Sequence, residues 1–206
     1  MARFSPEVKI AVEETMRKNM RNAVYALLAE KELNAISVAD VAKKINVSSV
    51  TVYNYYPSRK DLIDDAVNHS RRAIMDKLLE AGGISADPVE TLLNLARVIC
   101  NDFEEHRFLF MARFAAVPHD GENALSAKEY FKVIINCFAS AISHGIELGI
   151  FRTINPEFAA MSLLGALMSF NRHASFKWIE LSVDERLAEI KNIIIEGFKN
   201  KETQNV

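Results

Sequence analysis

The chain of 206 residues is poor in the residues that break helices or hold metals. Seven glycines and five prolines are few for a sandwich or a barrel, and they favour a mostly helical protein. The two cysteines, Cys100 and Cys137, have no second cysteine or paired histidine at ligand spacing. We therefore expect free thiols rather than a metal site or a disulfide.

Long apolar runs are also absent from the sequence. The longest uncharged apolar run, residues 158–170, is too short to span a bilayer. The first residues, MARFSPEVKIAVEE, lack the apolar core of a signal peptide. These absences predict a soluble, cytoplasmic protein without a membrane partner.

No group of residues has the spacing of a catalytic site. The five histidines form no HExxH motif, the serines lack a nucleophile-elbow glycine pattern, and Gly82-Gly83 is not a phosphate loop. We expect no catalytic residue, no metal and no cofactor, and hence a protein that is not an enzyme.

Charge is distributed unevenly along the chain. The net charge of −2 gives no global sign of nucleic-acid binding. Residues 1–60 nevertheless carry ten Lys/Arg and six Asp/Glu, a balance of +4, whereas residues 61–206 have a balance of −6. A basic N-terminal part joined to an acidic remainder indicates a DNA-binding module attached to a domain that does not touch DNA.

Residues 47–57, VSSVTVYNYYP, contradict their own local preference. Val, Thr and Tyr dominate this segment and favour a strand. Upstream, residues 37–46 have apolar residues at helical spacing, and downstream Ser58 is a helix cap with Asp61 three residues later. A short turn and a two-turn helix fit the gap better than a paired strand. We interpret residues 37–56 as a helix-turn-helix.

Start and stop signals recur along the chain and predict an all-α fold of about nine helices. Asn46 tolerates the left-handed dihedrals that the turn before the recognition helix requires. We predict an N-terminal three-helix domain over residues 1–62 and a C-terminal helical domain over residues 63–206. The other expected helices cover residues 6 to about 33, 37–46, 58 to about 80, 88 to about 105, 107–117, 124–148, 156–178 and 182 to about 199, with a loop at 118–123.

Residues 27–67, LLAEKELNAISVADVAKKINVSSVTVYNYYPSRKDLIDDAV, resemble the DNA-binding domain of TetR-type transcriptional regulators. The resemblance implies an operator DNA as partner and a C-terminal domain that binds a ligand and dimerises. Asn46 and Val50 stand where the family commonly has glycine. We expect Val50 to make the DNA preference particular to this protein, because its methyl groups suit thymine methyls. The matching positions are Ser37-Val38, Val41-Ala42, Val47-Ser48, Thr51-Val52-Tyr53 and residues 56–62.

One face of the recognition helix is expected to pack inward through Val47, Val52 and Tyr56. The opposite face offers short polar and methyl groups suited to base edges in the major groove. Arg59 and Lys60 oppose the dipole of their own helix unless a phosphate lies over its start. Core packing is the alternative for the two tyrosines, and solvation for the two cations. The predicted DNA-binding residues are Ser37, Ser48, Ser49, Val50, Thr51, Tyr53, Asn54, Tyr55, Arg59 and Lys60.

The C-terminal domain is rich in large apolar residues, for which plain core packing is the simplest interpretation. The resemblance implies that some of them line an effector cavity. The predicted ligand-binding residues are Phe103, His106, Phe110, Phe114, Phe138, Met168 and Arg172.

Residues 158–170 are apolar on all sides, so they must be buried on more than one side. Ala159, Ser162, Ala166 and Ser169 form a stripe of small residues, and Ile193 and Ile195 widen the apolar arc of the last helix. We predict a homodimer through the last two helices, which implies a pseudo-palindromic operator.

These observations predict a dimeric, ligand-responsive transcriptional regulator, a repressor released from its operator by a small, mainly apolar effector. A helical carrier or sequestering protein without DNA binding is one alternative, and an all-helical enzyme is another. The basic N-terminal part argues against the first, and the lack of reactive groups argues against the second.

Overall fold

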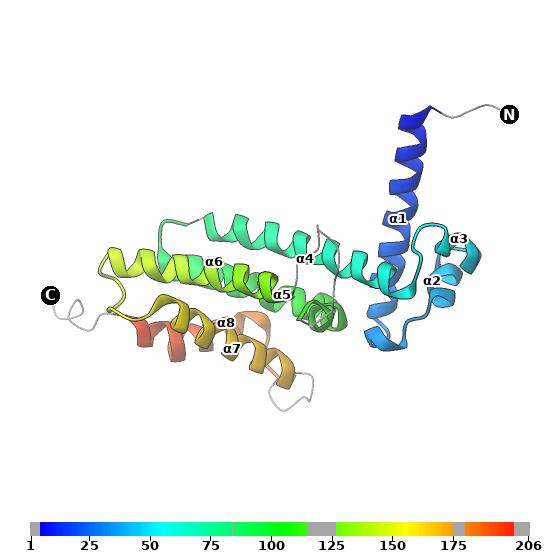
Figure 1. Cartoon of the computed structure of the whole chain (residues 1–206). Coiled ribbons are helices and arrows are strands. Elements are labelled where there is room, and N and C mark those ends of the chain that lie inside the picture. Colours follow the sequence, from blue (N-terminus) through cyan, green and yellow to red (C-terminus); the bar gives the residue numbers. More distant parts are fainter. Residues whose placement is uncertain (1–4, 84, 115–126, 175–179, 200–206) are drawn as a thin grey trace. The chain divides into compact units, whose positions relative to one another are not determined.

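The computed structural model describes residues 5–83, 85–114, 127–174 and 180–199 (Figure 1). Within these residues the chain forms eight α-helices and one isolated bridge, between Phe151 and Lys199, which confirms the all-α fold. The helices are α1 (Pro6–Leu28), α2 (Val38–Lys44), α3 (Ser49–Tyr53), α4 (Arg59–Gly83), α5 (Pro88–Phe114), α6 (Ala127–Glu147), α7 (Pro156–Ala174) and α8 (Val183–Ile190).

Helix α1 begins as predicted and ends earlier than predicted. Ser5 caps it by accepting a hydrogen bond from Val8 N at 3.4 Å. The expected end near Leu33 is wrong, because the chain leaves the helix after Leu28 and makes a 3₁₀ turn over Leu33–Ala35. This turn places the side chain of Ile36 in the core, which a continued helix would not do.

The apolar stripe of α1 is buried over only part of its length. Met20 and Val24 are fully buried, but Val8 and Val12 are exposed. A helical period therefore identified the correct face of α1, and the helix extends beyond the elements that cover this face.

Helix α5 contains a break at His106, whose backbone dihedrals (φ −139°, ψ 44°) are not helical. The sequence predicts two helices here, one ending near residue 105 and one starting at 107. The structure joins them across this kink, which accounts for eight α-helices in the described residues instead of nine. The loop predicted at 118–123 lies outside the described residues.

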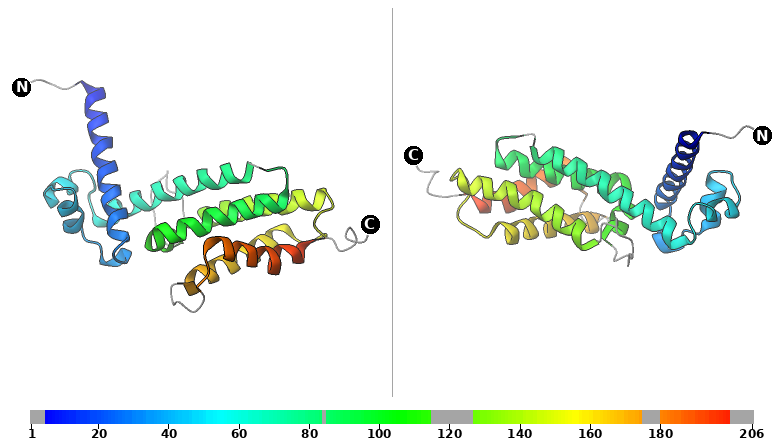
Figure 2. Two further views of the ribbon diagram at one scale, coloured as in Figure 1. Left: turned by 180° about the vertical axis from the view of Figure 1, so that it is seen from behind. Right: turned by 45° about the horizontal axis from the view of Figure 1, so that its top comes forward.

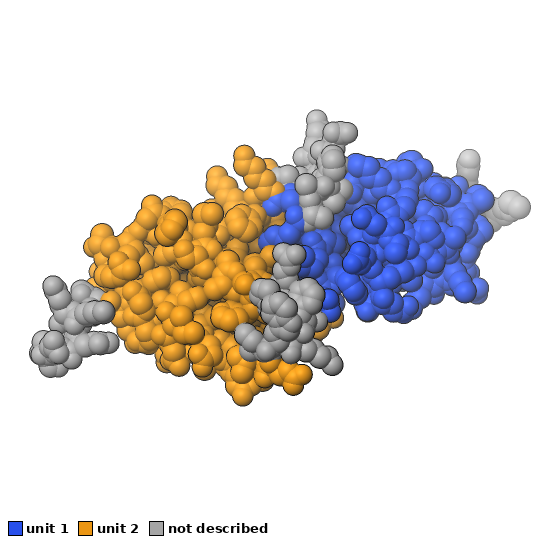
Figure 3. All heavy atoms as spheres, turned by 90° about the horizontal axis from the view of Figure 1, so that it is seen from below, with its two compact units in different colours: residues 1–71, 106–127 blue, residues 72–105, 128–206 orange. Residues whose placement is uncertain are grey.

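The chain divides into two compact units, which Figure 3 shows in different colours. Unit 1 comprises residues 1–71 and 106–127, and unit 2 comprises residues 72–105 and 128–206. Helices α4 and α5 each contribute residues to both units. The predicted domain boundary at residue 62 stays a prediction.

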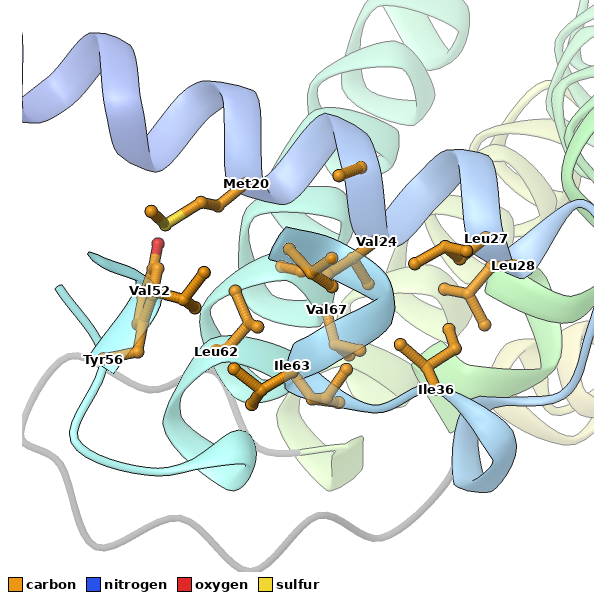
Figure 4. Packing of buried hydrophobic residues seen from close by; sticks show 14 of the residues in the cluster. Met20, Val24, Leu27, Leu28, Ile36, Val52, Tyr56, Leu62, Ile63 and Val67 are labelled. Carbon is orange, nitrogen blue, oxygen red and sulfur yellow. The ribbon is translucent and has the colours of Figure 1, made fainter. Parts of the chain in front are cut away.

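Unit 1 has one hydrophobic core, drawn in Figure 4. It joins α1, α2 and α3 to the first part of α4, and it includes Leu109 and Ala112 from the part of α5 that follows the kink. The other buried members are Met20, Ala23, Val24, Leu27, Leu28, Ile36, Val38, Val41, Ala42, Val52, Tyr56, Leu62, Ile63, Ala66 and Val67.

Unit 2 is a bundle in which α7 and α8 lie side by side (Figure 2). Ser182 caps α8 in a capping box with Glu185, as its position before the last apolar stretch predicts. Beyond Ile190 the chain continues as a π segment, Lys191–Ile195, and a 3₁₀ turn, Glu196–Phe198. Buried side chains from each helix form the core, including Leu78, Leu92, Leu95, Ile99, Tyr130, Ile134, Phe138, Ile142, Leu163, Leu167, Leu187 and Ile190.

The described residues contain neither a candidate membrane span nor a candidate metal cluster. Among these residues, no helix has both the length and the apolar character needed to cross a bilayer. The same residues contain no cluster of three or more His, Cys, Asp or Glu side chains that could hold a metal ion.

Candidate nucleic-acid interface

The turn between α2 and α3 is fixed by local hydrogen bonds. Asn46 has a φ of 56°, as predicted for the left-handed position, and Val47 N donates to Ala42 O at 2.9 Å. Ser48 caps α3 by accepting from Thr51 N at 3.0 Å, and its hydroxyl also contacts the Thr51 hydroxyl at 2.9 Å. Segment 47–57 therefore contains a short helix despite its preference for a strand.

The inward face of α3 agrees with the prediction. Val52 and Tyr56 are buried in the core of unit 1, together with Val38, Val41 and Ala42 of α2, and Val47 packs against this core. These contacts set which side of α3 faces solvent.

The opposite face of α3 is available to a partner. Val50 is 69% exposed and Tyr53 is 49% exposed, while Asn54 is exposed at the end of the helix. Ser49 is half-buried, and Thr51 is half-buried with its hydroxyl held by Ser48. Tyr55 is half-buried and packs against the core. The face therefore presents a methyl surface, an amide and a phenol.

The start of α2 contributes an exposed residue, Ser37, in a capping box with Asp40. The Ser37 hydroxyl donates to Asp40 Oδ2 at 2.7 Å and accepts from Asp40 N at 3.2 Å. Lys31 Nζ lies 2.8 Å from the same carboxylate oxygen. The Lys31 ammonium and the Ser37 donors hold the pKa of the Asp40 carboxyl well below its usual range.

The start of α4 carries the two predicted cations. Ser58 caps the helix by accepting from Asp61 N at 3.2 Å. Lys60 is exposed, and its Nζ lies 3.0 Å from Oδ2 of the buried Asp64. Arg59 is half-buried and donates to two backbone carbonyls of unit 1, those of Leu33 and Ile36.

Charged residues that the sequence did not single out contact Tyr56, which follows α3. Tyr56 Oη donates to Asp65 Oδ2 at 2.5 Å, and Arg21 Nη1 donates to the same oxygen at 3.1 Å. The Arg17 guanidinium lies 4.9 Å from the centre of the Tyr56 ring. Burial, followed by the bond to Asp65, raises the pKa of the Tyr56 phenol. These partners come from α1 and α4, so spacing within one helix gave no signal for them.

The predicted ligand-binding residues fall into both units. Phe103 and Phe138 are buried in unit 2, where Met168 is half-buried. In unit 1, Phe110 is buried, the ring centres of Phe110 and Phe114 are 5.2 Å apart, and His106 is exposed at the kink. The side chain of Arg172 lies outside the described part of the chain. Their role as a ligand site stays a prediction.

Helix α7 has an exposed apolar face. Phe158 is 72% exposed, and Met161, one turn further along, is also exposed. Ser162 and Ser169 of the predicted small-residue stripe are exposed, whereas Ala159 is buried and Ala166 is half-buried.

In the segment after α8, Ile193 is exposed but Ile195 is fully buried. The expected contribution of Ile195 to an outer face is therefore wrong. The turn into π geometry after Ile190 aims Ile195 at the core.

In the described residues, a capped helix-turn-helix with an exposed second helix is the arrangement typical of helix-turn-helix DNA-binding domains. Residues 22–66 match the family described as "Bacterial regulatory proteins, tetR family". The match covers the helix-turn-helix part of the chain and agrees with the resemblance at residues 27–67.

A curated protein is related to part of the chain. The HTH-type transcriptional regulator LuxR of Vibrio harveyi is 33% identical over 83 residues, which is 40% of this chain and 40% of that protein. The match thus spans less than half of the relative's length. It identifies a related part of the two proteins and leaves the activity of the whole chain to be proposed.

Solved structures share the fold over most of the chain. A protein from Saccharomonospora viridis in complex with choline has a TM-score of 0.78 at 15% identity, with 91% of this chain and 100% of that chain covered. AibR, in complex with isovaleryl coenzyme A and operator DNA, has a TM-score of 0.69 at 16% identity, with 86% and 97% covered. At these identities the likeness shows the fold alone.

Proposed function

We propose that the protein is a dimeric, ligand-responsive transcriptional regulator of the cytoplasm that represses genes by binding a pseudo-palindromic operator. The observation that carries the proposal is the outward face of α3, where Val50, Tyr53 and Asn54 are exposed on a helix fixed by caps and core contacts. Methyl and amide groups such as those of Val50 and Asn54 read base edges in the major groove. The operator complex of AibR shows that a protein of this fold binds DNA.

Residues around α3 serve to hold the DNA backbone in this proposal. Ser37 and Ser48 lie at helix starts, where exposed N–H groups favour phosphate, and Lys60 adds a positive charge at the start of α4. Tyr53 and Tyr55 bring phenol groups to the rim. Ser49, Val50, Thr51 and Asn54 face the bases.

A small, mainly apolar effector is proposed to bind unit 2 and change the affinity for DNA. The buried aromatic side chains of α5 and α6 support an apolar ligand, and α4 carries residues of both units. Such an effector acts only if it binds two conformations of the dimer with different affinity.

The direct test is selection of bound sequences from random DNA, followed by binding measurements at several salt concentrations. A regulator selects a pseudo-palindrome and binds it with a steep salt dependence. Binding that is insensitive to sequence and salt would exclude the proposal and favour a carrier without DNA binding.

Replacing Lys60 by Gln is expected to weaken binding to all DNA sequences. The plot of log K against log salt falls less steeply when a phosphate contact is lost, by about one unit of slope per subunit. Lys77→Gln is the matched control, because Lys77 is exposed on the same helix but belongs to unit 2. Equal salt dependence of binding for wild type and the Lys60 variant would show that Lys60 makes no phosphate contact.

The dimer is proposed to form through α7, α8 and the π segment that follows α8. Phe158 and Met161 of α7 and Ile193 of the π segment are exposed. An apolar face of this kind on a helix normally marks an association surface. Phe158→Glu is expected to convert a micromolar dimer into monomer, as measured by sedimentation. Leu79→Glu is the control, since Leu79 is an exposed leucine on α4. A wild-type monomer, or a dimer that only the Leu79 variant breaks, would refute this interface.

A further inference from the structure

Arg59 is the first residue of α4, and its side chain is bound to the segment that leads into α2. Its Nε donates to Ile36 O at 2.5 Å, and its Nη2 donates to Leu33 O at 2.6 Å. These carbonyls belong to the 3₁₀ turn Leu33–Ala35 and the residue that follows it. Leu33 O also accepts from Ile36 N at 3.3 Å within the turn. A carbonyl oxygen has two lone pairs, so the guanidinium gives Leu33 O a second donor and binds Ile36 O at the same time.

The segment held by Arg59 adjoins two proposed phosphate contacts. The side chain of Ile36 lies in the core, so this segment is also held by hydrophobic packing (Figure 4). The next residue, Ser37, caps α2 and is exposed. On the α4 side, the residue after Arg59 is the exposed Lys60. The two hydrogen bonds of Arg59 thus join the helix starts that carry Ser37 and Lys60.

We propose that Arg59 is a positioning residue for DNA binding, which fixes the start of α2 against the start of α4, and that it is not itself a phosphate contact. The inference rests on the proposed function. Its physical basis is geometric, because a guanidinium offers several N–H donors in a planar fork and can bind two carbonyls at once. An ammonium at the same place is a point charge and cannot reproduce this fork.

The two roles of Arg59 predict different outcomes for substitution by lysine. A phosphate contact needs positive charge, so Arg59→Lys keeps it and Arg59→Met removes it. A positioning role needs the fork, so both variants lose it. Lysine and methionine at this position therefore separate charge from geometry, with Lys60→Gln as the reference for a lost phosphate contact.

The experiment measures binding of the full-length protein and both variants to the DNA selected by wild type and to a scrambled duplex, over a range of salt. We expect both variants to lose about tenfold in the ratio of specific to scrambled affinity, which corresponds to about 1.4 kcal/mol. The salt slopes should equal that of wild type, because the number of phosphate contacts is unchanged. Amide exchange of Ile36 and Ser37 in the free variants should be faster than in wild type.

Three results would overturn the inference about Arg59. One is that the Lys variant binds DNA like wild type, while the Met variant has a less steep salt dependence. Arg59 would then be a phosphate contact. Another is that both variants melt at a lower temperature than wild type, but keep the wild-type ratio of specific to scrambled affinity at temperatures well below melting. Arg59 would then only stabilise the fold. The third is unchanged amide exchange at Ile36 and Ser37. Absence of sequence-preferring binding by wild type would instead refute the proposed function, and this inference with it.

Discussion

Substituting Gly145 by Ala is expected to lower the free energy of unfolding by about 2–4 kcal/mol, although alanine is the better helix former. A Cβ at this position would lie 2.2 Å from Cδ2 and 2.4 Å from Cε2 of Phe151. No rotation of the added methyl relieves such an overlap. The Phe151 ring must leave its place, or the backbone must move.

The Phe151 ring occupies a tightly defined position at the end of α6. It is 2% exposed and packs edge-on against Phe198, with ring centres 6.2 Å apart. Gly149 has a φ of +70°, and this turn lets Ile150 N and Phe151 N both donate to Gly145 O at 2.9 Å. The turn therefore folds the ring directly over the glycine, and only a residue without a side chain fits beneath it.

Chemical denaturation followed by circular dichroism, at one protein concentration, measures the effect. Gly82→Ala is the matched control, because its Cβ would meet Leu95 Cδ2 at an ordinary 3.9 Å. This control is expected to be neutral or to stabilise by up to about 1 kcal/mol, since alanine favours helix over glycine. Equal stabilities for the two variants would show that Phe151 does not depend on Gly145.

Substituting Arg71 by Met is expected to destabilise unit 1 by about 3 kcal/mol. Arg71 is 2% exposed, and its Nε and Nη2 donate to Arg113 O at 2.9 and 2.6 Å. Its Nη1 donates to Asn68 Oδ1 at 3.2 Å. Methionine fills a similar volume but cannot donate, so the three hydrogen bonds to these carbonyl and amide oxygens are lost, and losing buried hydrogen bonds from a charged donor is costly.

The loss should appear where α4 meets the end of α5. Arg113 lies in the last turn of α5, and its own Nε donates to Ser70 Oγ at 2.5 Å. With the Arg71 bonds gone, residues 107–114 should exchange amide protons faster, and the melting temperature should fall by roughly 10 °C. Arg72→Met is the control, because Arg72 is exposed one residue away and surface charges contribute little. An Arg71 variant as stable as the Arg72 variant would contradict the expectation.

The sequence predicted the helix starts of the described residues well. Ser5, Ser37, Ser48, Ser58 and Ser182 lie at or beside the expected helix starts, and each side chain accepts from the N–H three residues later. A cap bond of this kind depends only on neighbours in the chain, so short patterns reveal it. The inward face of α3 was predicted for the same reason, since it follows from helical spacing.

The sequence predicted helix ends and burial less well. Val8 and Val12 have the spacing of a buried face but are exposed, because no element of the described residues covers that part of α1. Helix α1 also ends at Leu28, before the predicted end near Leu33, and the chain then turns so that Ile36 reaches the core. Both errors concern what lies opposite a helix, which a local pattern does not contain.

The sequence by itself determined the all-α fold, the helix-turn-helix and the side chains that α3 turns toward solvent. The tertiary structure decided what Arg59 and Arg71 do. The sequence offered Arg59 as a phosphate contact, whereas its hydrogen bonds go to carbonyls 23 and 26 residues earlier. Arg71 is fixed by a carbonyl 42 residues later. Such partners meet only after the helices have packed, and a long side chain then binds whichever acceptors lie within its reach.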